Sequence, residues 1–214
     1  MRTYLSPIGF NSTSVTRPLL RHGLDMDDRV VVVRPTEGTD EARSKEAIAD
    51  VRRLLGEIEP KISLSVERVP HDEFEEAVLY CRDIIHAAEG ELVVNLSGGA
   101  RDVFLPFATA VLSESDRVSR TLCFSDIDGR VRELSLPNLS VELSESVAKT
   151  LAAIEQLGGK TSIPELTETG EQAKSTVTRH VTELESHGAV VSEKQGKIKY
   201  VSMTLTGELL LGRR

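Results

Sequence analysis

The segment Arg29-Val30-Val31-Val32-Val33-Arg34 decides how the first part of this chain folds. Four consecutive β-branched residues are apolar on both faces, which is typical of a strand that helices cover on both sides of a parallel sheet. On either side of this segment, short apolar runs alternate with longer stretches of helical periodicity. That alternation predicts an α/β fold with a mostly parallel sheet, in which this segment forms a central strand.

The expected strands and helices of this part follow from the same short apolar runs and the same stretches of helical periodicity. Strands are expected over residues 2–5, 29–34, 62–69, 91–95, 121–125 and 131–136, and helices over 14–22, 40–58, 72–88 and 102–115. The last two strands are separated by Asp126-Ile127-Asp128-Gly129, where Asp-Gly supplies the positive φ of a tight turn. We therefore expect these two strands to form an antiparallel hairpin at the edge of the sheet.

The pattern changes after Pro137, where we place the end of a first domain over residues 1–137. A linker over 138–144 leads to a second domain over 145–214. Its expected elements are a helix from Ser144 or Ser146 to 157, a short helix capped by Ser162 and Glu165, a third helix over 171–186, strands over 189–193 and 197–203, and helical turns over 204–211. This order is that of a winged helix-turn-helix.

Charge differs between the two domains. The chain has 214 residues, of which 39% are hydrophobic and 28% charged, and its formal net charge is -8. Residues 145–214 hold nine basic and nine acidic residues, so the first 144 residues, with 17 basic and 25 acidic, carry the whole excess. This balance argues against a protein coated with positive charge for non-specific binding of nucleic acids or membranes, but allows a local basic patch.

The sequence also bears on location and metal binding. The start of the chain lacks the apolar core of a signal peptide, and no run approaches the ~18 apolar residues of a membrane span. We therefore expect a cytoplasmic protein without a membrane partner. Cys81 and Cys123 lack the paired spacing of a zinc or redox site, so we expect buried apolar cysteines and no metal.

Polar residues share one face of the third helix of the second domain. Val177, Val181 and Leu184 recur at intervals of four and three, so they form the buried stripe. The candidate DNA-binding residues lie on the opposite face and on the following hairpin: Lys174, Ser175, Thr178, Arg179, Thr182, Lys194, Lys197 and Lys199. Short hydroxyl side chains let a helix approach a duplex closely, and arginine offers a fork for phosphate or guanine. A solvated polar face is the alternative, but the capped helix before it and the lysine-bearing hairpin after it favour DNA binding.

Two glycine-containing loops of the first domain are candidate ligand sites. Residues 6–13 (Ser-Pro-Ile-Gly-Phe-Asn-Ser-Thr) follow the first strand, and residues 95–101 (Asn-Leu-Ser-Gly-Gly-Ala-Arg) follow the fourth. Both lie at the carboxyl ends of expected parallel strands and lead into helix N-termini, where open α/β sheets bind ligands and unpaired amides attract anions. Glycine removes the Cβ atoms that would hold a phosphate away, and Arg101 adds positive charge. Because the G-x-G-x-x-G fingerprint is missing, the loops indicate a nucleotide-like ligand other than a dinucleotide.

The segments Ile8-Gly9-Phe10 and Asn95-Leu96-Ser97-Gly98-Gly99-Ala100-Arg101, followed by a winged helix, resemble the CRISPR-associated Rossmann-fold (CARF) transcriptional regulators. The resemblance covers nearly the whole chain. It implies a Rossmann-like sheet, a homodimer that binds cyclic oligoadenylate, often cyclic tetra-adenylate, across its two-fold axis, and winged helices that bind promoters of CRISPR genes. It also implies a ligand-binding set of Ile8, Gly9, Phe10, Asn11, Ser97, Gly98, Gly99 and Arg101. Relatives often have a hydroxyl residue where Ala100 stands, so Ala100 would not supply that hydrogen bond.

Some members of this family cleave their cyclic ligand, which requires a positioned 2′-hydroxyl and a stabilised transition state. The five histidines are scattered, and none lies in either glycine loop. Ser97 lacks the G-x-S-x-G elbow and an identifiable base. We therefore expect a ligand-responsive transcription factor without catalytic residues and without a cofactor other than its cyclic oligoadenylate ligand. The alternatives are a ring nuclease that carries a DNA-binding tail and a regulator that senses another anionic metabolite.

Overall fold

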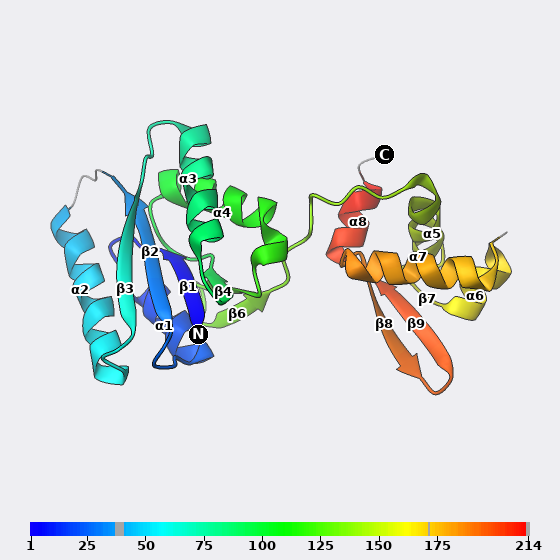
Figure 1. Ribbon diagram of the computed structural model, residues 1–214, viewed down its shortest axis with the longest axis horizontal. Helices are drawn as coiled ribbons and strands as arrows, with labels where there is room; N and C mark the ends of the chain where they lie inside the picture. Colours follow the sequence, from blue (N-terminus) through cyan, green and yellow to red (C-terminus); the bar gives the residue numbers. More distant parts are fainter. Residues whose placement is uncertain (37–40, 171, 213–214) are drawn as a thin grey trace. The chain divides into compact units, whose positions relative to one another are not determined.

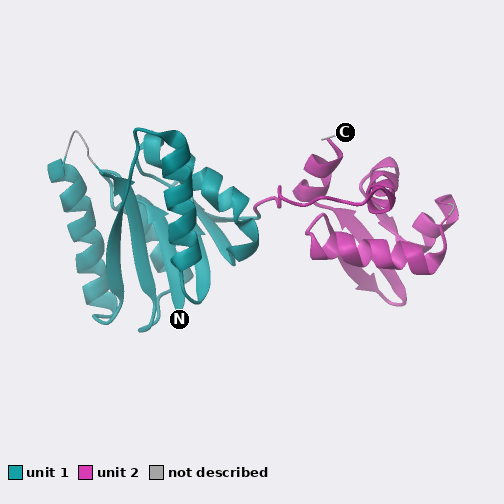
Figure 2. Ribbon diagram, turned by 45° about the horizontal axis from the view of Figure 1, so that its top comes forward, with its two compact units in different colours: residues 1–135 teal, residues 136–214 magenta. Residues whose placement is uncertain are grey.

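The computed structural model describes residues 1–36, 41–170 and 172–212. The chain divides into two compact units, Met1–Ser135 and Leu136–Arg214 (Figure 2). This division falls two residues before the 1–137 boundary that the change of sequence pattern indicates. Within the described ranges, no helix is both long and apolar enough to cross a membrane.

The first unit contains a six-stranded sheet in the order β3-β2-β1-β4-β5-β6 (Figure 1). Its strands are β1 (Arg2–Pro7), β2 (Arg29–Pro35), β3 (Ser63–Val69), β4 (Glu91–Asn95), β5 (Arg120–Phe124) and β6 (Val131–Leu134). Neighbouring strands from β3 to β5 are parallel, and β6 pairs antiparallel with β5, with Phe124 opposite Val131. Gly129 in the turn between them has φ +68°. The α/β fold, the mostly parallel sheet and the edge hairpin are therefore confirmed.

The expectation that β2 is a central strand is wrong. β1 and β4 occupy the middle of the sheet, and β2 lies one strand in from the β3 edge. Val30, Val32 and Val33 are buried, whereas Val31 is half-buried. A strand next to the edge can be apolar on both faces because helices cover both faces there. The valine run therefore indicates burial but not the position of the strand in the sheet.

Helices lie on both faces of this sheet (Figure 1). They are α1 (Thr13–His22), α2 (Glu41–Ile58), α3 (Phe74–Ala87) and α4 (Arg101–Ser113), followed by the 3-10 turn η1 (Ser115–Arg117). The expected second helix starts at residue 40, which lies outside the described residues. Each of these four helices connects two parallel strands, which places the N-termini of α1 and α4 at the carboxyl edge of the sheet.

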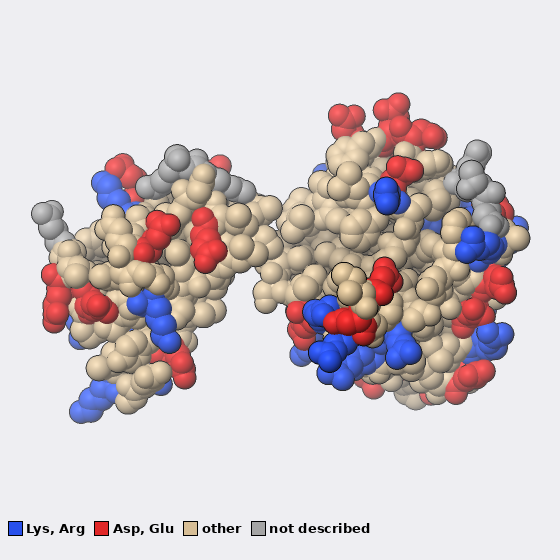
Figure 3. Space-filling view, turned by 180° about the vertical axis from the view of Figure 1, so that it is seen from behind, with Lys and Arg blue, Asp and Glu red and all other residues tan. Residues whose placement is uncertain are grey.

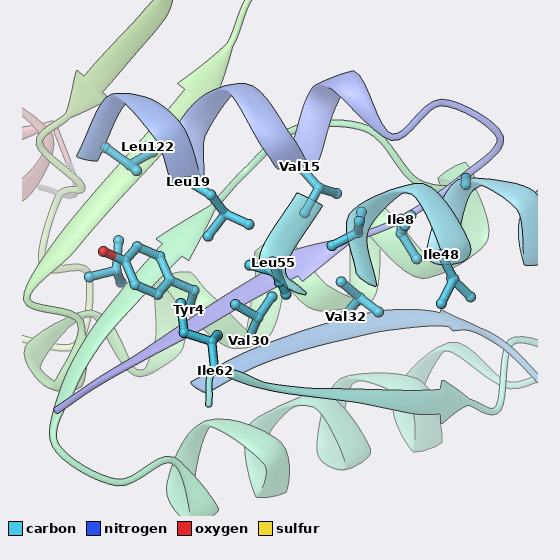
Figure 4. Close-up of a cluster of buried hydrophobic side chains, with 13 residues drawn as sticks. Tyr4, Ile8, Val15, Leu19, Val30, Val32, Ile48, Leu55, Ile62 and Leu122 are labelled. Atoms are coloured by element: carbon cyan, nitrogen blue, oxygen red, sulfur yellow. The ribbon is translucent and has the colours of Figure 1, made fainter. Parts of the chain in front are cut away.

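Alternate residues of the strands and every third or fourth residue of helices α1 and α2 supply the side chains of the core between the sheet and these helices (Figure 4). Tyr4, Val30 and Val32 are sheet residues that point to one face. The helices contribute Val15, Leu19, Ala47, Ile48, Val51 and Leu55. Ile8, in the loop after β1, is 1% exposed and belongs to the same cluster. The first glycine loop is therefore anchored to the core at its start.

The second unit combines helices with a three-stranded antiparallel sheet in the order β7-β9-β8. Its elements are α5 (Glu145–Gln156), β7 (Lys160–Ser162), α6 (Ile163–Thr169), α7 (Lys174–Ser186), β8 (Val190–Gln195), β9 (Ile198–Met203) and α8 (Leu205–Leu211). Strand β7 is not indicated by the sequence, because three residues carry no period and their pairing with β9 is a tertiary contact. The expected start of the third helix, residue 171, lies outside the described residues.

Two serines cap helices of this unit as the sequence predicts. The hydroxyl of Ser144 accepts a hydrogen bond from the Val147 amide at 3.4 Å, and that of Ser162 accepts one from the Glu165 amide at 3.4 Å. The Glu165 carboxylate does not complete a capping box, because it accepts a hydrogen bond from Thr161 Oγ1 at 2.7 Å instead. That contact links the start of α6 to β7.

Candidate functional site

The two glycine loops meet at the carboxyl edge of the sheet. β1 and β4 are adjacent and parallel, so the loops that follow them leave neighbouring strand ends. They border a cavity of about 530 Å³. Its lining residues are Ile8, Gly9, Phe10, Asn11, Ser14, Arg34, Pro35, Ser44, His71, Gly98, Gly99, Ala100, Asp102 and Asp126. The structure therefore brings together most of the expected ligand residues and adds several from β2, α2 and the loops after β3 and β5.

Glycine is required where the loops touch. Gly98 has φ +71° and Gly99 has φ +82°, both in the left-handed region that L-residues avoid. A Cβ on Gly99 would lie 2.6 Å from the Cβ of Pro7, and one on Gly98 would lie 3.0 Å from the Cβ of Ser14. Gly9 packs directly on Gly99, since its own Cβ would lie 3.5 Å from Gly99 Cα. The backbones of the two loops can approach this closely only without side chains.

A buried hydrogen-bond network holds the loops in register. The residue Asn95 is 6% exposed, and its side-chain nitrogen Nδ2 donates to Ser6 Oγ at 2.7 Å and to the Ser14 carbonyl at 2.8 Å. Ser97 Oγ donates to Asn95 Oδ1 at 2.7 Å and accepts from the Phe124 amide at 2.5 Å. Ser97 is buried and is not among the residues that line the cavity. The structure thus gives Ser97 a supporting role, which differs from the ligand contact that the resemblance implies.

Helix α4 starts at the cavity without a side-chain cap. Ala100 is its N-cap residue, and its methyl group cannot accept a hydrogen bond from the first amides; only its carbonyl accepts, from the amides of Val103 at 3.0 Å and Phe104 at 2.8 Å. Unpaired amides and the helix dipole make such a start attractive to anions. Asp102, in the first turn, lines the cavity and places a carboxylate there. Arg101 is exposed and is not a lining residue, so the positive charge expected from it lies outside the cavity of this unit.

Polar residues that the sequence interpretation missed complete the lining. Arg34 is the only Lys or Arg among the described lining residues, and it shares the cavity with Asp102, Asp126 and His71. Arg34 lies near the end of β2, and His71 follows β3, so both belong to the same carboxyl edge as the glycine loops. Extending the rule for open α/β sheets to every parallel strand would have found them.

The first loop presents one aromatic ring. Phe10 is 50% exposed, and the guanidinium carbon of Arg43 lies 4.7 Å from the centroid of its ring. The side chain of Asn11 accepts a hydrogen bond from the Thr13 amide at 2.8 Å, which fixes the start of α1. Because Ile8 is buried in the core, it can form only the floor of the cavity.

The expected polar face of α7 is exposed in the second unit. Val177, Val181 and Leu184 are buried, and the exposed residues of α7 include Lys174, Ser175, Thr178, Arg179 and Thr182. Thr178 Oγ1 donates to the Lys174 carbonyl at 2.8 Å, and Thr182 Oγ1 donates to the Thr178 carbonyl at 3.0 Å. Both hydroxyl protons are therefore used within the helix, and these threonines offer lone pairs rather than donors to a partner.

The three lysines of the β8–β9 hairpin are not equivalent. Lys194 and Lys197 are exposed, whereas Lys199 Nζ donates to Glu185 Oε2 at 2.6 Å. Partial burial works against ionisation of Glu185, but Lys199 holds the pKa of that carboxyl below its ordinary value. Figure 3 shows basic and acidic side chains interspersed on the visible face of this unit, so that face carries no continuous basic surface.

Among the described residues, no group of three or more His, Cys, Asp or Glu side chains could hold a metal ion. The expectation of buried cysteines is confirmed for Cys81 and wrong for Cys123, which is half-buried. Cys81 is buried, and burial raises the pKa of its thiol to about 12. The Cys81 thiol is therefore protonated at neutral pH and unsuited to nucleophilic chemistry.

A mostly parallel sheet with a cavity where glycine loops leave its two middle strands defines the first unit as a Rossmann-like α/β domain. The family model of the Csa3 CRISPR-associated Rossmann-like domain matches residues 2–135, and the chain therefore belongs to that family. The match lies within the first unit and confirms the CARF part of the resemblance.

The solved structures that match this chain share little sequence with it. Protein VC1899 from Vibrio cholerae is 10% identical, with a TM-score of 0.47, over 99% of this chain and 64% of its own. Csm6 from Enterococcus italicus, solved with cyclic hexa-2'-fluoro-hexa-dAMP, is 11% identical, with a TM-score of 0.49, over 88% of this chain and 56% of its own. BpsR from Bordetella bronchiseptica, whose DNA binding is regulated by 6-hydroxynicotinic acid, is 16% identical, with a TM-score of 0.32, over 35% of this chain and 54% of its own. The chain thus spans about half to two thirds of the length of these proteins. No curated protein matches it.

Proposed function

We propose that the chain is a ligand-responsive transcription regulator of CRISPR genes. In this proposal the first unit binds a cyclic oligoadenylate, taken to be cyclic tetra-adenylate, and the second unit binds promoter DNA. The observation that carries the proposal is the cavity between the glycine loops, which combines positive-φ glycines, an uncapped helix start and an exposed aromatic ring. Membership of the Csa3 family supports it.

Each part of the cavity suits one part of an oligoadenylate. The ring of Phe10 offers an adenine a stacking surface, an interaction worth ~1–3 kcal/mol per base. The amides at the start of α4, and the bare backbone at Gly98 and Gly99, suit phosphodiester oxygens. A cyclic ligand of repeated units would be contacted equally by two copies of the cavity about a two-fold axis. We therefore propose a homodimer, in which the exposed Asn11 and Arg101 contact the ligand at the rim.

We propose that the second unit is a winged helix-turn-helix. In this arrangement α6 and α7 form the helix pair, α7 enters the major groove, and the β8–β9 hairpin is the wing. The exposed face of α7 and the exposed Lys194 and Lys197 support this assignment. Arg179 is the candidate for reading a base, and the lysines are candidates for phosphate contacts. Lys199 is a weaker candidate because Glu185 already holds its ammonium.

We propose binding without catalysis for the first unit. One observation favours the alternative of a ring nuclease, namely that the cavity lining includes His71, and histidine is the side chain that most often acts as a general base. The Nδ1 atom of His71 lies 3.4 Å from Thr36 Oγ1, and Nε2 lies 3.7 Å from Asp72 Oδ1. A regulator that senses another anionic metabolite is the third candidate.

Incubation of the full chain with labelled cyclic tetra-adenylate separates the three candidates. Retention of intact ligand supports the proposed sensor. Linear products support the ring nuclease, and in that case His71→Asn should abolish turnover while leaving retention in place. Absence of binding to cyclic oligoadenylates of several ring sizes would overturn the proposed ligand and favour another metabolite.

A further inference from the structure

Arg34 is a buried cation at the edge of the cavity. The residue is 2% exposed, lies near the end of β2 and is a lining residue. Arginine is rarely buried to this degree unless its charge and its donors are fully paired. The pairing of Arg34 is incomplete among the residues that the structure describes.

Arg34 has more N–H donors than there are acceptors paired with them among the described residues. Nη2 donates to Glu41 Oε1 at 2.5 Å, whereas Nε is buried and has no hydrogen-bond partner in the described part of the chain. A guanidinium presents five N–H donors in a fixed fork, which matches the oxygens of a phosphate. Arg34 therefore has donor capacity in reserve at the wall of the cavity.

Glu41, the partner of Arg34, has other cations within reach. It is the first residue of α2, and its side chain is 39% exposed. Its carboxylate lies 3.8 Å from Lys45 Nζ and 3.9 Å from Arg68 Nη1. If a bound anion replaced Glu41 as the partner of Arg34, the Glu41 carboxylate would still have Lys45 and Arg68 nearby and would not be left as an isolated buried charge.

We propose that Arg34 is the phosphate-binding residue of the cavity and that the Glu41 carboxylate is an internal competitor which a ligand phosphate displaces. The proposal rests on the proposed function and names the charge that recognises the ligand. Asp102 and Asp126 make the rest of the lining unfavourable for an anion, so a cation must be available inside. Arg34 is the only Lys or Arg that the described lining supplies.

The test compares the affinity of the full chain for cyclic tetra-adenylate by calorimetric titration in three variants. Arg34→Met should weaken binding by about 10- to 100-fold, because a charge-assisted contact is lost. Glu41→Gln should strengthen binding by about 3- to 10-fold, because a neutral amide competes less well for the guanidinium. Lys45→Gln is the matched control, since it also removes a charge near Glu41 but does not line the cavity; it should change affinity by less than about twofold.

The opposite signs distinguish recognition from a structural ion pair. If Arg34 and Glu41 only stabilised the fold, both variants would lower the melting temperature and both would weaken binding. The double variant Arg34→Met/Glu41→Gln leaves no unpaired charge of the pair, so it should fold and still bind weakly. Wild-type-like binding by Arg34→Met, or weaker binding by Glu41→Gln, would overturn the proposal.

A second probe keeps this inference separate from the proposed function. If the wild-type chain does not bind cyclic tetra-adenylate, the proposed ligand is wrong, and pyrophosphate then tests the anion site directly by its effect on the melting temperature. Stabilisation that grows in Glu41→Gln and disappears in Arg34→Met would support Arg34 as an anion site. Equal responses of all three proteins to pyrophosphate would overturn it.

Discussion

Gly99→Ala is expected to destabilise the first unit by about 2 to 4 kcal/mol. The positive φ of Gly99 costs an L-residue ~1–2 kcal/mol. A Cβ at this position would lie 2.6 Å from the Cβ of Pro7, and relieving such an overlap costs ~1–3 kcal/mol. The ring of Pro7 cannot rotate away, so the two loops must separate. Alanine also lowers the conformational entropy of the unfolded chain, but this stabilising effect offsets only ~0.4–1 kcal/mol of the destabilisation.

Substitutions at two other glycines separate the cost of the positive φ from the cost of the steric overlap. Gly129 has φ +68°, but an added Cβ would meet nothing within 4 Å, so Gly129→Ala measures backbone strain alone and should cost about 1 kcal/mol. Gly9 lacks a positive φ, and its added Cβ would be in ordinary contact, 3.5 Å from Gly99 Cα. Gly9→Ala should therefore change stability by less than about 0.5 kcal/mol.

Differential scanning calorimetry of the full chain measures these effects. For a unit of this size, each kcal/mol should lower the melting temperature by ~3–6 °C. Gly99→Ala should therefore melt well below Gly129→Ala, and it should also bind cyclic tetra-adenylate more weakly because the loops have moved apart. If Gly99→Ala and Gly129→Ala melt together, the close approach of the loops does not exist and the reasoning is refuted.

Further predictions concern acid stability and DNA. Burial of Asp28 opposes its ionisation, but hydrogen bonds from the side chain and backbone of Arg2 hold the pKa of Asp28 below its ordinary value of 3.8. The contribution of ionised Asp28 to the free energy of unfolding is therefore complete above about pH 4 and is lost as the pH falls through the folded-state pKa. In urea unfolding, Asp28→Asn should lower the free energy of unfolding by about 3 kcal/mol near neutral pH, and the stability of the variant should fall less steeply in acid. In promoter binding, Lys197→Ala should reduce the slope of log affinity against log salt by about 1, whereas Lys199→Ala, whose ammonium is already paired, should leave it unchanged. Arg179→Ala should cost about 1 to 3 kcal/mol of discrimination between promoter and scrambled duplexes, measured by competition.

Local chemistry made much of the fold predictable from the sequence. The Asp-Gly turn, the serine caps at Ser144 and Ser162, and the stripe of Val177, Val181 and Leu184 each depend on residues close together in the chain. The meeting of the two glycine loops was predictable for a different reason. Loops after neighbouring parallel strands must start at the same edge of a sheet.

Features that depend on distant pairings could not be found in this way. The place of β2 in the strand order and the existence of β7 are decided by partners far along the chain. A motif also does not show the direction of a side chain, so Ser97 was expected in the cavity although it bonds Asn95 and the Phe124 amide. Arg34 belongs to no motif, and only its place near the carboxyl end of a parallel strand could have pointed to the site.

Coupling between the two units is tested most directly by titrating promoter DNA onto the full chain at fixed salt, with and without saturating cyclic tetra-adenylate. A ligand can shift the DNA-competent population only by its differential affinity for two arrangements, and typical couplings are ~1–3 kcal/mol. The proposed regulator predicts a change in promoter affinity of about 5- to 150-fold, with the reciprocal change in ligand affinity when promoter DNA is present. Identical promoter affinities in the two titrations, with ligand binding confirmed in the same sample, would contradict it.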